Sequence, residues 1–120
     1  MTSLELAQRA ALALDNKKGL HIRIVRIDAI SSLADYFVFA TGTSTTHVRS
    51  LTEAVEEAMD KLSVEPYGKE GYGSGTWSLL DYASVVVHVF TPEARDYYDL
   101  DRLWSDGEEV PFQKEGNDTI

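Results

Sequence analysis

The 120 residues are 43% hydrophobic and 26% charged, which is the balance of one globular domain and excludes a disordered chain. The sequence has no cysteine, no signal-peptide pattern and no run of about 18 apolar residues, so it excludes disulfides, thiolate metal sites and a membrane span and makes the cytoplasm the expected location. The net charge of −9 disfavours direct nucleic-acid binding and favours a basic protein partner, although such acidity also serves solubility alone.

The first quarter of the chain predicts a helix followed by a strand. Thr2 and Glu5 have the spacing of a capping box, and apolar residues at helical spacing follow them, so we expect a first helix of about a dozen residues. Residues 21–27 mix β-branched and basic residues in near alternation, which is typical of a strand with one solvated face. The adjacent apolar pair Ile24 and Val25 indicates a bulge in that strand.

A buried strand and a long helix come next. Residues 36–41 are almost entirely apolar, which predicts a central strand covered on both faces. The Gly, Thr and Ser residues at 41–46 supply a turn and several candidate N-caps. From Val48 to Leu62 apolar residues recur at three and four positions, which predicts an amphipathic helix packed on the sheet.

The second half predicts a hairpin and a short helix. Four glycines within residues 66–75 indicate a mobile loop. The strand-like runs at 76–82 and 85–90 are separated by two residues only, so they must form a hairpin, with the second strand central in the sheet. Thr91 before Pro92 is typical of the start of a helix.

The resulting order of elements, α-β-β-α-β-β-α, predicts an α/β (α+β) fold in which helices pack on a mixed sheet. From Asp106 onward the chain is polar and has little to bury, so we expect this end to fray. The expected organisation is one domain over residues 1–105 and a flexible C-terminal tail over residues 106–120.

The sequence contains no complete set of catalytic residues. Its three histidines lie on different predicted elements without metal-ligand spacing, so we expect neither a metal nor a cofactor. The strand, glycine-serine turn and helix over residues 36–62 resemble the nucleotidyltransferase fold. Catalysis by that fold needs two acids two residues apart on a later strand, whereas here Asp81 stands alone and Leu79 occupies the other position. The expectation is therefore a nucleotidyltransferase-like fold without catalytic acids, and no enzymatic activity.

Large aromatic residues and acids alternate between Trp77 and Trp104. Strand alternation places Trp77, Leu79 and Asp81 on one face. Tyr and Trp concentrate at the centres of protein interfaces, and carboxylates around them can pair with Lys or Arg of a partner. The segment therefore fits the binding of a basic protein, although the packing of a small core explains the aromatics equally well.

Two strings carry a resemblance to a known family. WSLLDYASVVVHVFTPEARDYYDLDRLW, residues 77–104, and DYFVFATGTSTTHVRSL, residues 35–51, resemble motifs of the ribosomal silencing factor family (RsfS, Iojap-like). The Glu70-Gly71 step is similar to a glutamate-glycine step of that family, and the resemblance covers roughly residues 4–105. The chain departs from the pattern at Ala83-Ser84, where the family leads us to expect glycine and aspartate.

The resemblance implies a non-enzymatic repressor of translation, without a cofactor, that binds ribosomal protein fourteen of the large subunit. Bound there, it would obstruct docking of the small subunit when nutrients are scarce. An exposed apolar face also makes a homodimer of the free protein plausible. The residues that the resemblance assigns to partner binding are Trp77, Leu79, Asp81 and Tyr82, then Glu70 and His88, with Asp99 and Asp101 as a possible second contact.

Two alternatives remain open. A metal-dependent nucleotidyltransferase or another nucleotide-binding enzyme would use Gly42, Ser44 and Asp81, and predicts binding of nucleotide and magnesium. A large-subunit assembly factor would stay on immature subunits and would sediment mainly with precursors.

Overall fold

The computed structural model describes residues 1–71 and 75–112, which form six strands and four helices. The helices are α1 (Ser3–Asn16), α2 (Thr45–Lys61), α3 (Pro92–Tyr98) and α4 (Leu100–Leu103). The strands are β1 (Leu20–Arg26), β2 (Tyr36–Thr41), β3 (Gly68–Glu70), β4 (Trp77–Asp81), β5 (Val85–Phe90) and β6 (Glu108–Val110). They form one mixed sheet in the order β3-β4-β5-β2-β1-β6, which confirms the predicted class of fold.

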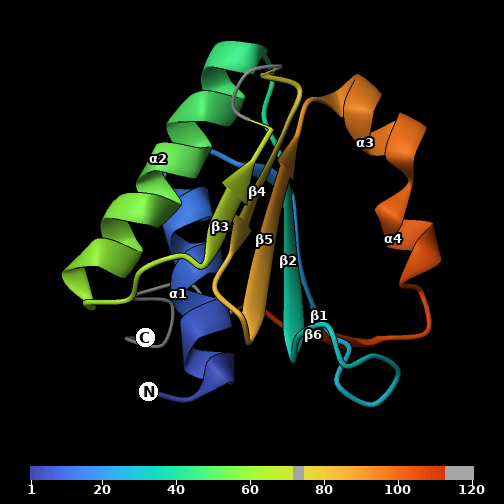
Figure 1. Cartoon of the computed structure of the whole chain (residues 1–120). Coiled ribbons are helices and arrows are strands. Elements are labelled where there is room, and N and C mark those ends of the chain that lie inside the picture. The colour runs from blue at the N-terminus through green and yellow to red at the C-terminus, as the bar shows by residue number, and fades with distance from the viewer. Residues whose placement is uncertain (72–74, 113–120) are drawn as a thin grey trace, which may run out of the picture.

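Helices α1 and α2 cover one side of the sheet (Figure 1). Each begins where the sequence predicts, because a side-chain oxygen accepts a hydrogen bond from a free helix N–H. In α1 the capping box forms: Thr2 Oγ1 accepts from the Glu5 N–H at 3.1 Å, and Glu5 Oε1 accepts from the Thr2 N–H at 2.8 Å. In α2 the cap is Ser44, which accepts from the His47 N–H. Their apolar stripes bury the larger core cluster against the sheet.

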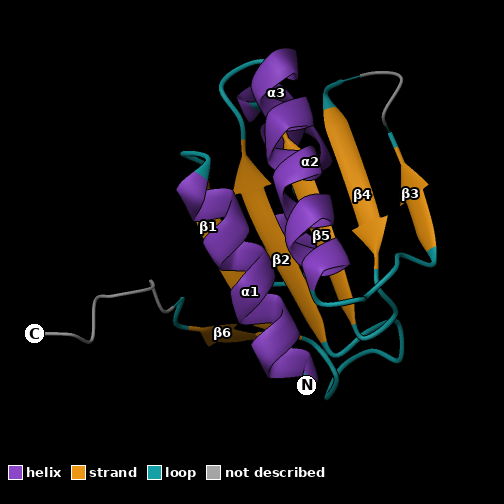
Figure 2. Cartoon of the chain, turned by 90° about the vertical axis from the view of Figure 1, so that its left-hand side faces the viewer, coloured by secondary structure: helices purple, strands orange, loops and turns teal. Residues whose placement is uncertain are grey.

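Strands β2 and β5 form the centre of the sheet, and every residue of both is buried. They pair in parallel, whereas β4 and β5 form the predicted antiparallel hairpin with Trp77 opposite Phe90. Viewed from the helical side, β4 and β3 extend beyond α2 at one edge of the sheet (Figure 2). The sheet therefore presents its β3–β4 end away from the main helical layer.

The second side of the sheet is only partly covered. The α3–α4 arm, residues 92–103, lies beside it (Figure 1) and packs Ala94 and Leu100 into a smaller cluster. As predicted, Thr91 caps α3, with Oγ1 accepting from the Ala94 N–H, and Pro92 stands at the first turn. Trp104 closes the arm onto Phe37 with ring centroids 5.0 Å apart. Aromatic packing therefore fixes the arm against the strands.

Two short strands lie where the sequence predicted none. Within the predicted loop at 66–75, the prediction is wrong for Gly68–Glu70, which pairs with β4, while residues 72–74 lie outside the described residues. The expected fraying from Asp106 is wrong for Glu108–Val110, which pairs antiparallel with β1, while residues 113–120 lie outside the described residues. Three residues carry too little pattern to predict a strand, because their pairing depends on the partner strand.

The bulge of β1 also lies earlier than predicted. The pairing with β2 is regular from Arg23 to Arg26, so Ile24 and Val25 are not bulged. The register shifts between Leu20 and Arg23, where His21 has a φ of 49°. Its carbonyl accepts a hydrogen bond of 2.7 Å from Arg95 Nη1 of α3, so the bulge is attached to the α3–α4 arm.

Candidate protein-binding face

The β4 face consists of Trp77, Leu79 and Asp81, the alternate residues of β4 that point away from α2. All three are partly exposed, while Ser78 and Leu80 between them are buried, so the predicted alternation is confirmed. Ser78 shares a buried hydrogen bond of 2.5 Å with Thr52 of α2, which fixes the strand from the helical side. The β4 face is therefore a rigid strip of one indole, one aliphatic side chain and one carboxylate.

Strand β3 continues this face toward the edge of the sheet. Glu70 pairs with Leu79 across the strands and is exposed. Its neighbour Lys69 forms an ion pair of 2.6 Å with Glu56 of α2. Because β3 is the last strand in the order, its outer edge has no strand paired to it among the described residues. Glu70 therefore places a second carboxylate beside the apolar strip.

Aromatic rings hold Trp77 in place. Its ring stacks on Phe90 with centroids 5.5 Å apart and planes at 16°, and it contacts Tyr98 of α3 at 4.7 Å. Its Nε1–H donates a long hydrogen bond of 3.4 Å to Nδ1 of His88, whose ring lies at 6.1 Å. A preorganised indole loses little entropy when a partner covers it, which is the condition for a binding anchor.

His88 supports the face from below. It is 4% exposed, and burial lowers the pKa of its imidazole from 6.5 to about 4, so the ring is neutral at pH 7. Since Nδ1 accepts from Trp77, Nε2 carries the proton, and this buried N–H has no hydrogen-bond partner among the described residues. The resemblance assigns His88 to partner binding, whereas its burial and its hydrogen bond to Trp77 fit a residue that orients the indole.

Asp81 has a local structural role at the end of β4. Its Oδ1 accepts a hydrogen bond of 2.8 Å from the Ala83 N–H, which closes the turn of the hairpin. Ala83 has a φ of 69°, in the left-handed region that favours glycine. The hairpin therefore adopts the conformation of a glycine-containing turn although alanine stands at this position.

Tyr82 does not lie at the rim of the β4 face. Its side chain is 6% exposed and belongs to the large core cluster under α1 and α2, on the side of the sheet opposite the β4 face. Burial raises the pKa of its hydroxyl to about 12, and the oxygen has no hydrogen-bond partner in the described structure. The predicted rim role is thus at odds with this position, because the residue follows Asp81 on a strand and points the other way.

Asp101 is engaged within the chain. Arg95 binds both of its oxygens, from Nε at 2.9 Å and from Nη2 at 2.8 Å, and Arg23 of β1 binds Oδ1 at 2.5 Å. These two guanidinium groups lower the pKa of Asp101 to about 2, against the opposing effect of burial. Asp101 therefore fastens the arm to the sheet, whereas Asp99, with a φ of 53° between α3 and α4, remains half exposed.

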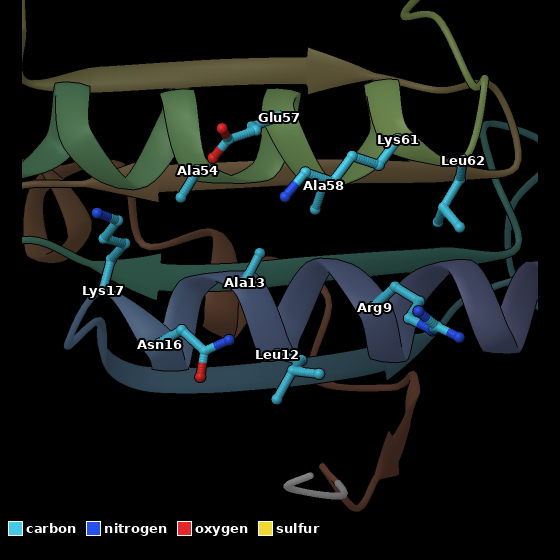
Figure 3. Close-up of a pocket in the computed structure, with 10 residues that line it drawn as sticks. All are labelled: Arg9, Leu12, Ala13, Asn16, Lys17, Ala54, Glu57, Ala58, Lys61 and Leu62. Atoms are coloured by element: carbon cyan, nitrogen blue, oxygen red, sulfur yellow. The ribbon is translucent and has the colours of Figure 1, made fainter.

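A groove on the other side of the molecule is separate from this face. It runs between α1 and α2 and has a volume of about 260 Å³ (Figure 3). Its lining combines alanines and leucines with charged side chains of both signs, Arg9, Lys17, Lys61 and Glu57. Over residues 1–71 and 75–112 no three His, Asp or Glu side chains are grouped so that they could hold a metal ion. Within the same ranges no helix has the length and hydropathy that crossing a membrane requires.

One exposed apolar segment escaped the sequence reasoning. Residues 27–35, which link β1 to β2, hold Ile30 and Leu33 in solvent, 47% and 66% exposed. The available signal was two large aliphatic residues in a connection too short to have a core of its own. Helical and strand periodicity do not apply to so short a link, so the exposure of Ile30 and Leu33 was not predicted from the sequence.

The fold and the β4 face together define a small mixed α/β domain with an aromatic and acidic strip on one side of its sheet. The model of the family described as "Ribosomal silencing factor during starvation" (RsfS) matches residues 1–119. A ribosomal silencing factor of Halalkalibacterium halodurans is 34% identical over 94% of this chain and 97% of its own length. The chain belongs to the ribosomal silencing factor family.

Further relatives agree on the fold and widen the range of functions. A crystal structure of a protein from Chromobacterium violaceum matches with a TM-score of 0.86 and 35% identity, over 98% of each chain. A mouse protein named "Mitochondrial assembly of ribosomal large subunit protein 1" is 32% identical over 70% of this chain, which corresponds to 38% of the mouse protein. The names of these relatives describe ribosomal silencing and, for the mouse protein, mitochondrial assembly of the ribosomal large subunit.

Proposed function

We propose that this protein binds the large ribosomal subunit through ribosomal protein fourteen, uses the β4 face and Glu70 to do so, and thereby blocks association of the small subunit. Translation would then fall when nutrients are limited. The observation that carries the proposal is a partly exposed, rigidly supported Trp77 with carboxylates on its own strand and on the neighbouring strand β3, in a chain of the silencing factor family. The proposed place of action is the cytoplasm.

The physical support comes from charge and shape. A net charge of −9 attracts a basic ribosomal protein and repels the phosphates of exposed RNA, so a protein contact is favoured over an RNA contact. Trp77 and Leu79 would supply the desolvated centre of the interface, and Asp81 and Glu70 would pair with Lys or Arg around it. His88 would act through Trp77, and Asp101 through the arm that carries Tyr98.

The proposed repression is steric and requires no chemistry. A domain with principal extents of 35 × 30 × 29 Å, held by its β4 face, would project its helical layer away from the large subunit. A small subunit cannot approach closely where that layer stands. In the free protein the same apolar face could pair with a second copy, so we propose that a homodimer competes with ribosome binding.

An assembly role is the second candidate, and the name of the mouse relative favours it. It makes a different prediction for the same face. An assembly factor would bind precursors of the large subunit in preference to mature ones, whereas the silencing proposal requires binding to mature subunits.

The test is co-sedimentation of the purified protein with mature large subunits, followed by addition of small subunits at fixed salt and magnesium. We expect the protein to sediment with the large subunit and to reduce the yield of complete ribosomes. Trp77→Ala should weaken binding about 30-fold, because an anchor of this kind contributes at least about 2 kcal/mol. A folded Trp77→Ala variant that binds like the unchanged chain would remove the β4 face from the proposal.

A charge reversal gives a second test that does not disturb packing. Glu70→Lys should weaken binding, and Glu57→Lys, at an exposed residue of α2 on the opposite side of the sheet from the β4 face, should leave it unchanged. If both changes weaken binding equally, the effect reflects net charge and not the face. Sedimentation with precursors alone would decide for the assembly role.

A further inference from the structure

The link between β1 and β2 holds apolar side chains in solvent on a fixed backbone. The Ile30 N–H donates to the Ile27 carbonyl at 3.0 Å, and the Leu33 N–H donates to Ser31 Oγ at 3.1 Å. Ile30 and Leu33 are 47% and 66% exposed, so the fold gains little from their size. Exposed apolar groups that are close in sequence and held in an ordered turn are typical of a contact surface.

This link lies on the same side of the sheet as the β4 face. Ile27 at its start and Ala34 near its end are buried in the smaller cluster, against which Trp77, Leu79 and Trp104 also pack. The Asp35 N–H donates to the carbonyl of Ser84 at 2.8 Å, so the link is attached to the hairpin that follows Asp81. In Figure 1 the link projects at the lower right, on the side of the arm.

The arm adds an apolar group and acids on the same side of the sheet. Leu103 of α4 is exposed, and Trp104 after it packs on Phe37 of β2, the strand that the link enters. Asp99 and Asp106 flank α4 and are at least partly exposed. The surface on this side therefore combines aliphatic groups with negative charge, which is complementary to a basic protein and not to a membrane of anionic lipids or to RNA.

We propose that Ile30, Leu33 and Leu103 form a second contact area, the aliphatic shelf, for the same basic ribosomal protein that the β4 face binds. This inference rests on the proposed function. It extends the interface from one sheet edge across the hairpin to the β1–β2 link, so that the partner spans two apolar areas. Two of its three residues, Ile30 and Leu33, lie outside the sequence motifs at 35–51 and 77–104.

Matched leucine-to-serine changes test the shelf in the complete chain with purified mature large subunits. Leu33→Ser should raise the dissociation constant about tenfold, since a largely exposed leucine that becomes buried contributes about that factor. Leu4→Ser, at a residue 40% exposed on α1, should leave the dissociation constant unchanged. Thermal unfolding of each variant establishes that it is folded.

The outcomes separate the shelf from the proposed function. Weakening by Leu33→Ser and by Ile30→Ser, with none by Leu4→Ser, supports the shelf. Unchanged binding by the folded Ile30→Ser/Leu33→Ser double variant, while Trp77→Ala weakens binding, overturns the shelf and leaves the proposed function standing. If the unchanged chain does not bind large subunits, the proposed function fails and the shelf falls with it.

Discussion

The guanidinium of Arg95 allows a sharp prediction about stability. Its side chain is 11% exposed and makes four hydrogen bonds: two to Asp101, one of 2.9 Å to Thr41 Oγ1 and one of 2.7 Å to the His21 carbonyl. The group also lies 5.8 Å from the centre of the Phe39 ring. It therefore joins the arm, the bulge of β1 and the end of β2.

Arg95→Gln should lower the free energy of unfolding by about 3 kcal/mol, because Asp101 would stay partly buried with only one of its two cationic partners. For a chain of 120 residues this corresponds to a fall in Tm of about 12 °C. Urea denaturation at pH 7 measures the loss. Arg102→Gln is the matched control, because Arg102 is 87% exposed and lies 3.9 Å from Asp99, so its removal should cost less than about 0.5 kcal/mol.

The pH dependence gives an independent check of the same reasoning. The pKa of Asp101 is about 2 in the folded chain against an ordinary 3.8, so the ionised group stabilises the fold above pH 4 by at most about 2.5 kcal/mol. That contribution is lost as the pH falls from about 4 to 2. The unchanged chain and Arg95→Gln should therefore differ less in their free energies of unfolding at pH 2 than at pH 4. A loss below about 1 kcal/mol at pH 7, or a difference that stays constant down to pH 2, would refute the role given to this ion pair.

Two further predictions concern His88 and Gly71. Burial lowers the pKa of His88 to about 4, so as the pH falls the unfolded chain binds this proton before the folded chain does, and the free energy of unfolding should decrease from pH 6.5 to pH 4. His88→Phe should lose less stability over that range, which urea denaturation at several pH values measures. An equal decrease in the free energy of unfolding for both proteins would contradict this. A Cβ on Gly71, which has a φ of 86°, would overlap the Trp77 carbonyl, so Gly71→Ala should destabilise by more than about 2 kcal/mol. The control Gly68→Ala meets open space and should be tolerated, and an equal cost for both changes would show that the overlap is not the cause.

Elements whose signal is local followed from the sequence. Three predictions depended on residues close together in the sequence, and all three are confirmed: the capping box of α1, the buried strand β2 and the hairpin of β4 and β5. Strands β3 and β6 were missed because three residues become a strand only when a partner strand lies beside them. The bulge at His21 was misplaced because the Arg95 hydrogen bond that accompanies it comes from 74 residues away.

In the candidate site, too, local patterns were predicted and contacts between distant residues were not. Alternation along β4 placed Trp77, Leu79 and Asp81 together, and the same alternation, carried one residue further, already put Tyr82 on the opposite side. The engagement of Asp101 by two arginines could not be read from spacing, since Arg23 lies 78 residues from it. The family motifs identify which residues recur, whereas contacts across the fold decide which of them face outward.

The pairing of β6 with β1 has a consequence for the newly made chain. Until residues 108–110 have been synthesised, β1 has one open edge, and open edges are where strands of separate chains join and aggregate. Arg23 and Arg26 lie on β1 and later form ion pairs with Glu109 and Glu108. Before those acids arrive, Arg26 is already paired with Asp28, but the charge of Arg23 is not yet met by Glu109 and repels the same strand of a second chain. The arginine that later attracts β6 therefore also protects the incomplete sheet.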